Sequence, residues 1–106
     1  MITEYKLGIN IKDLEDNVPI PVAAGGKDLA LVKVDGKMHA LDGLCSHKQG
    51  PLGKGRVENG NLICPWHHGT FSAESGKASE KTPWVTDINV YKVRVDSTNG
   101  DIFVEF

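Results

Sequence analysis

The chain has 106 residues, of which 12 are Lys or Arg and 14 are Asp or Glu, so its formal net charge is −2 at pH 7. This length predicts one domain, residues 1–106. The near balance of charge argues against the basic surface of a nucleic-acid-binding protein and against a polybasic membrane contact. Residues 1–6 contain no apolar signal-peptide core. We therefore expect a folded, soluble, cytoplasmic protein that binds neither nucleic acid nor a membrane.

The first forty residues are mostly typical of β-structure. Residues 5–9 predict a strand, and residues 12–17 are the one stretch where a helical turn is expected. A β-rich run follows at residues 29–35. The dipeptide Asp35-Gly36 is a hairpin turn signal, and residues 37–41 would form the returning strand.

Short strands and turns also dominate the rest of the chain. Gly76 and the pair Asn99-Gly100 mark turns. Alternation in the last segment places Ile102, Val104 and Phe106 on one face of a strand. The strands predicted here cover residues 61–64, 70–72, 90–95 and 101–106. Many short strands with frequent turn signals predict an all-β protein, built as an antiparallel sandwich or barrel.

Glycine is concentrated in the middle of the chain. Seven of the twelve glycines lie between residues 43 and 76. Because glycine adopts backbone conformations that other residues avoid, this density predicts tight turns and close approach of backbone segments. Residues 43–83 therefore look like an insertion of loops and short strands between two β-rich arms.

Two clusters in this insertion combine cysteine with histidine, namely Cys45-Ser46-His47 and Cys64-Pro65-Trp66-His67-His68. A pair of cysteines in a cytoplasmic chain favours metal binding or redox chemistry over a structural disulfide. Zinc and iron are the metals that most readily accept mixed thiolate and imidazole ligands. A structural zinc module is one alternative, although zinc motifs usually pair Cys with Cys and His with His, whereas each cluster here mixes the two.

The pattern Cys-x-His, sixteen residues, then Cys-x-x-His resembles the Rieske [2Fe–2S] motif. By this resemblance, Cys45 and Cys64 would bind the inner iron, and His47 and His67 the outer iron. The segment Gly50-Pro51-Leu52 matches the same family, and roughly residues 5–106 follow a soluble Rieske ferredoxin. The resemblance implies one [2Fe–2S] cluster per chain and a Rieske-type antiparallel β fold, with a cluster-binding subdomain at about residues 43–83 inserted in a basal β domain.

The resemblance also bears on the reduction potential. Two neutral imidazoles in place of two thiolates leave the cluster less negative, which makes adding an electron easier. High-potential respiratory Rieske proteins carry an extra disulfide, a Ser hydroxyl and a Tyr hydroxyl near the cluster. Those positions hold Gly50, Trp66, Gly69 and Phe71 here. We therefore expect a potential near the low end of the Rieske range, about −150 mV.

A low-potential, single-domain Rieske protein resembles the ferredoxin of a multicomponent aromatic-ring oxygenase. Such a protein takes one electron from a flavoprotein reductase and passes it to a terminal oxygenase. The chain has no Gly-x-Gly-x-x-Gly motif for a nucleotide cofactor. We therefore expect an electron carrier rather than an enzyme, and a monomer. The alternative within the family is the small Rieske subunit of a nitrite reductase or of another redox complex.

Overall fold

The computed structural model describes residues 3–44, 51–66 and 68–106. In the described residues the chain forms β-strands and two short 3₁₀ turns, η1 (Ile11–Asp13) and η2 (Leu52–Lys54), with no α-helix. The strands are β1 (Glu4–Asn10), β2 (Ile20–Ala24), β3 (Lys27–Val34), β4 (Lys37–Asp42), β5 (Arg56–Glu58), β6 (Asn61–Ile63), β7 (Thr70–Ser72), β8 (Val90–Val95) and β9 (Asp101–Glu105). The fold is all-β and antiparallel, as the sequence predicts.

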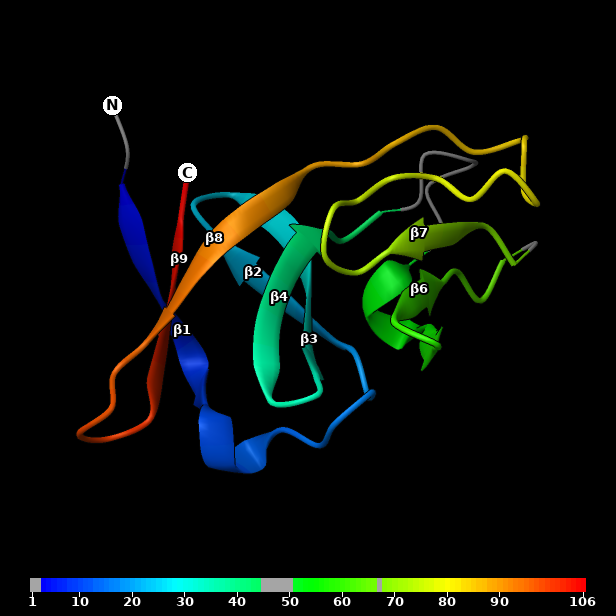
Figure 1. Ribbon diagram of the computed structural model, residues 1–106. Coiled ribbons are helices and arrows are strands. Elements are labelled where there is room, and N and C mark those ends of the chain that lie inside the picture. The colour runs from blue at the N-terminus through cyan, green and yellow to red at the C-terminus, as the bar shows by residue number, and fades with distance from the viewer. Residues whose placement is uncertain (1–2, 45–50, 67) are drawn as a thin grey trace.

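Six strands form the larger sheet, in the order β1-β9-β8-β4-β3-β2. Every neighbouring pair is antiparallel, and the sheet curls into a nearly closed barrel, which lies on the left in Figure 1. The β3–β4 hairpin turns at Asp35 and Gly36, whose φ angles are 51° and 79°. Two successive residues with positive φ suit the tight turn between twisted strands, and the Asp-Gly pair adopts them at small cost.

Strand β3 is buried on both of its faces. Leu29 and Leu31 point into the barrel, whereas Ala30 and Val32 belong to a second apolar cluster, and none of the four is more than 1% exposed. Because side chains alternate along a strand, a strand that separates two cores must be apolar at successive positions. The location of β3 between two cores therefore explains why its apolar run, which begins at Leu29, is continuous.

The three remaining strands form a small sheet in the order β5-β6-β7, on the right in Figure 1. An antiparallel bridge from Phe71 to Ala78 adds one further residue pair beside β7. The second core fills the space between this sheet and the outer face of β3 and β4. Its buried members are Ala30, Val32, Leu41, Leu52, Leu62, Cys64, Phe71, Ala73, Val85 and Ile88.

The strands predicted from the sequence are confirmed, with ends that differ by no more than two residues. The helical turn expected at residues 12–17 is wrong in position and length. The chain forms instead a single 3₁₀ turn at Ile11–Asp13, where the Asn10 side chain accepts a hydrogen bond from the Lys12 N–H and the Asp13 carboxylate accepts one from the Asn10 N–H. Because of this reciprocal capping, the 3₁₀ turn begins directly after β1. Strands β2 and β5 were not predicted.

Two glycines in the middle of the chain allow close backbone contact. A Cβ atom added at Gly55 would lie 2.1 Å from the carbonyl oxygen of Ile63, and one at Gly76 would lie 2.2 Å from that of Ile88. Gly76 also has a φ of +74°. The prediction of close approach is confirmed at these positions, where the loops are packed against strands and against one another.

Of the described part of the chain, no helix has the length and apolar character to cross a membrane.

Candidate metal centre

Of the four predicted ligands, the structure describes Cys64. Cys45, His47 and His67 lie outside the described residues, and His68, the competing neighbour of His67, is described and exposed. Within residues 3–44, 51–66 and 68–106, no group of three or more Cys, His, Asp or Glu side chains is arranged to hold a metal ion. The ligand set Cys45, His47, Cys64 and His67 therefore stays a prediction.

Cys64 directly follows β6 and is completely buried in the second core. Its backbone N–H donates a hydrogen bond to the Gly69 carbonyl at 2.8 Å, which draws the two ends of the intervening loop together. The N–H of Trp66 points at the Cys64 sulfur, with a nitrogen-to-sulfur distance of 3.3 Å. A backbone N–H aimed at the sulfur stabilises negative charge there, as a metal-bound thiolate requires.

The loop after Cys64 turns back through an unusual backbone conformation. His68 has a φ of 58°, and its carbonyl accepts a hydrogen bond from the Thr70 hydroxyl at 3.0 Å. Trp66 in this loop is half exposed, at 50%. This exposure suits contact with a partner protein better than packing beneath the loop.

A loop at residues 79–89 is fastened against the small sheet. The hydroxyl oxygen of Thr82, a side chain that is only 7% exposed, accepts a hydrogen bond from the Thr70 N–H at 3.2 Å. Asp87 accepts one from the Ala78 N–H at 2.8 Å, and Ile88 is buried in the second core. Both ends of this loop are held in place, and Trp84 at its centre is exposed.

Backbone hydrogen bonds hold the described residues on either side of residues 45–50. The Gly43 N–H donates to the Asp28 carbonyl at 2.9 Å, and the Leu52 N–H donates to the Gly43 carbonyl at the same distance. An antiparallel bridge also joins Leu44 to Pro51. Residues 44 and 51 are therefore neighbours in the structure.

Sequence reasoning missed the contacts of Asp42 and Tyr91. The Tyr91 hydroxyl donates a hydrogen bond to one carboxylate oxygen of Asp42, and the Asn89 N–H donates to the other at 2.9 Å. Burial raises the pKa of Tyr91 to about 12, and the hydrogen bond to Asp42 acts in the same direction. Nothing in the sequence pairs Tyr91 with Asp42, which is 49 residues away.

The residues around Cys64 fit an iron–sulfur cluster. Phe71 is fully buried in the same core as Cys64 and offers no hydroxyl. Gly69 likewise carries no side-chain hydroxyl, and the Trp66 N–H donates a hydrogen bond to the Cys64 sulfur. A buried cysteine that receives a backbone hydrogen bond suits a cluster ligand, and its apolar surroundings keep water away from one side.

The fold is that of a small antiparallel β domain with Cys64 in its second core. A family model described as "Rieske [2Fe-2S] domain" matches residues 5–92. The chain belongs to the Rieske [2Fe–2S] domain family, and its cofactor is one [2Fe–2S] cluster. This favours the iron–sulfur interpretation of the Cys and His clusters over a structural zinc module.

Three relatives illustrate the likeness. A "Naphthalene 1,2-dioxygenase/salicylate 5-hydroxylase systems, ferredoxin component" from a Ralstonia species is 33% identical over 87 residues, which cover 82% of this chain and 83% of that protein. The solved ferredoxin of carbazole 1,9a-dioxygenase from Nocardioides aromaticivorans IC177 superposes with a TM-score of 0.86 at 26% identity, and the match covers 96% of each chain. A structure described as an NADH-dependent nitrite reductase small subunit from Mycobacterium tuberculosis has a TM-score of 0.84 at 19% identity, covering 100% of this chain and 95% of that one, and shows the fold alone.

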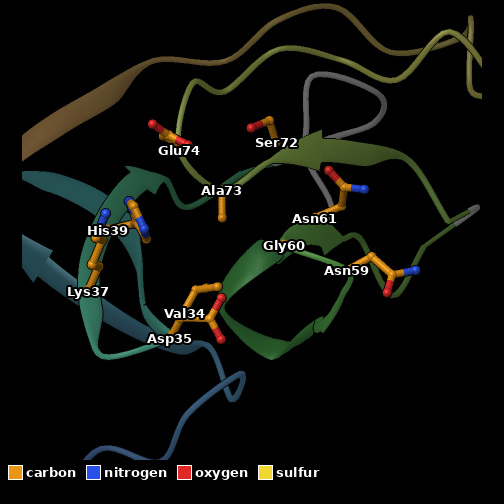
Figure 2. Close-up of a pocket in the computed structure, with 10 residues that line it drawn as sticks. All are labelled: Val34, Asp35, Lys37, His39, Asn59, Gly60, Asn61, Ser72, Ala73 and Glu74. Carbon is orange, nitrogen blue, oxygen red and sulfur yellow. The ribbon is translucent and has the colours of Figure 1, made fainter.

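A polar cavity of about 370 Å³ lies between the β3–β4 hairpin and the small sheet (Figure 2). Lys37 and His39 line it from β4, and Glu74 lines it from the turn after β7. Burial lowers the pKa of His39 below its ordinary value of 6.5, and the Lys37 charge lowers it further, whereas Glu74 opposes both. His39 is thus a half-buried strand residue that carries a charge less readily than a free imidazole.

This shift predicts a pH dependence of stability. Because the folded state holds the His39 proton less tightly than the unfolded chain, its contribution to stability is present above about pH 6.5 and is lost as the pH falls through the lowered pKa. His39→Gln should reduce the fall in melting temperature between about pH 7.5 and 5.5. Glu74→Gln removes the opposing charge and should enlarge it. Melting curves followed by circular dichroism measure both, and equal falls in the three proteins would contradict this assignment.

Proposed function

We propose that the protein is a one-electron carrier that takes an electron from a flavoprotein reductase and passes it to a terminal oxygenase. The observation that carries the proposal is the likeness to ferredoxin components of dioxygenase systems, which extends over more than four-fifths of both chains. Those relatives are carriers within their systems and not the catalysts. The protein is therefore an electron-transfer component rather than an enzyme.

The chemistry that the cluster supplies is the reversible uptake of one electron. The chain contributes the ligands and the surroundings that set the potential. In our proposal, Cys45 and Cys64 would bind one iron, and His47 and His67 would bind the other. Cys64 is held in an apolar core, and the Trp66 N–H stabilises its sulfur.

Exposed apolar side chains support transfer to protein partners. Leu44, Trp66 and Trp84 are each at least 40% exposed, and each belongs to a loop at the cluster-binding part of the chain. Large apolar side chains left on the surface commonly mark sites of protein contact. We place the docking of redox partners at these loops.

The proposal includes the domain organisation and the location. The chain forms one domain in which about residues 43–83 hold the cluster. Reduced thiolates are required to bind the irons, and the cytoplasm keeps thiols reduced, which supports a cytoplasmic location. The alternative role is that of a small subunit bound permanently in a nitrite reductase. Only the shared fold supports this alternative.

The ligand set is tested by substitution. Cys45→Ala and His67→Ala should each prevent formation of the holoprotein, because each removes one of four bonds to the cluster. The matched control is His68→Ala, which should retain the cluster. Iron content and visible absorption measure the outcome, and circular dichroism checks that each variant folds. A red-brown Cys45→Ala protein with full iron content would show that the ligand set is wrong.

The potential is the second test. We expect a midpoint near the low end of the Rieske range, about −150 mV, because the hydroxyl donors of high-potential proteins are replaced by Gly69 and Phe71. Phe71→Tyr would restore one hydroxyl, and the midpoint should rise because that donor stabilises the added negative charge. A spectroelectrochemical titration measures both values. A wild-type midpoint well above about 0 mV would contradict this interpretation of the cluster surroundings.

The relay itself is tested by reconstitution. The holoprotein should carry electrons from a flavoprotein reductase of an aromatic-ring dioxygenase system to its terminal oxygenase, measured as product formed per NADH consumed. Cys45→Ala is the control that lacks the carrier. Size-exclusion chromatography of the native protein distinguishes the alternative role, since a carrier elutes alone and a fixed subunit elutes with its complex. No transfer to any oxygenase, combined with stable co-elution, would favour the nitrite reductase role.

A further inference from the structure

A set of hydrogen bonds joins the start of the first ligand loop to the end of the loop at residues 79–89. Asp42 is the last residue of β4 and stands three positions before Cys45. Its carboxylate accepts hydrogen bonds from the Tyr91 hydroxyl and from the Asn89 N–H. Its own N–H donates to the Asn89 carbonyl at 3.0 Å. Asp42 is thus held through its backbone and through both carboxylate oxygens.

Tyr91 is itself fixed by aromatic contacts. Its ring meets the Phe106 ring edge-on, with centroids 5.2 Å apart, and Phe106 stacks on Tyr5 at 4.8 Å. The ammonium group of Lys27 lies 5.7 Å from the centre of the Tyr91 ring. Such packing restricts the ring to one orientation. The hydroxyl is therefore presented to Asp42 by a rigid support that the two ends of the chain build.

The hydroxyl also keeps its proton. Burial raises the pKa of Tyr91 to about 12. The phenol consequently remains a hydrogen-bond donor throughout the neutral range. A donor that is always protonated and held by its neighbours can fix a carboxylate more firmly than water can.

We infer that Asp42 is a positioning residue for residues 43–44, which lead to the predicted ligand Cys45, and that the Tyr91 hydroxyl holds its carboxylate in place. The inference rests on the proposed function, because it takes Cys45 to be a ligand. Asp42 precedes Cys45 by three positions in the chain, so its carboxylate is a negative charge on the segment that leads to this ligand, and such a charge disfavours the addition of an electron. The two donors to Asp42 offset part of that effect while they hold the end of β4.

The test compares three holoprotein variants. Asp42→Asn keeps the shape of the side chain and removes its charge. Tyr91→Phe removes the donor and keeps the ring on Phe106. Tyr5→Phe is the matched control, since it makes the same change in the same aromatic group on a residue that does not contact Asp42. The measurements are the midpoint potential and the hydrogen exchange rate of the Asn89 amide.

We expect Asp42→Asn to raise the midpoint and Tyr91→Phe to lower it, because the first removes the charge and the second leaves it less compensated. Loss of a hydrogen bond to a carboxylate should also speed exchange of the Asn89 amide by about tenfold in Tyr91→Phe. Tyr5→Phe should leave both quantities unchanged. Opposite shifts of the midpoint are not expected if Asp42 only supports the fold.

The inference is overturned if Tyr91→Phe and Tyr5→Phe give the same midpoint and the same Asn89 exchange rate. It is also overturned if Asp42→Asn and Tyr91→Phe shift the midpoint in the same direction. Failure of the proposed function has a different signature. In that case Cys45→Ala retains its cluster, whatever the behaviour of Asp42 and Tyr91.

Discussion

The burial of β3 and β4 between two apolar cores is the constraint on which the rest of the structure depends. One face of these strands closes the barrel through Leu29, Leu31 and Ala40, and the other supports the small sheet through Val32 and Leu41. Burying four successive residues of one strand contributes several kcal/mol, at about 25 cal/mol per Å² of apolar surface removed from water. The small sheet is thus packed on two strands that are buried on both faces, and Cys64 lies in the core between them.

This arrangement explains how the loops of a small domain can be held in place. A loop alone is more mobile than a strand. Here each loop is joined to the wall or to its neighbour by hydrogen bonds near its ends, as at Gly43 with Asp28, at Cys64 with Gly69 and at Thr82 with Thr70. The backbone contacts depend on glycine at positions such as Gly55 and Gly76, where a side chain would collide with a carbonyl oxygen. Glycine density in the middle of the chain is therefore a packing requirement of the loops.

Much of this could be predicted from local sequence. The β-rich runs, the Asp35-Gly36 turn and the alternation of β8 are signals within a few residues, and the structure confirms them. Strand β2 was not predicted because its Pro21 and small residues weaken the strand signal, although it pairs along its whole length with β3. The hydrogen bond from Tyr91 to Asp42 could not be predicted because it joins residues 49 positions apart. The spacing of Cys and His identified the family, whereas the positions of Cys45, His47 and His67 lie outside the described residues.

The apolar packing that fixes Cys64 also shapes the electrostatics around its sulfur. A fully buried Phe71 in the same core provides contact without polarity, and the Trp66 N–H donates a hydrogen bond to the sulfur. In a region of low dielectric, such a hydrogen bond matters more than it would in water. The residues that make the second core well packed therefore also determine the surroundings of the Cys64 sulfur, so that stability and electrostatics depend on the same side chains.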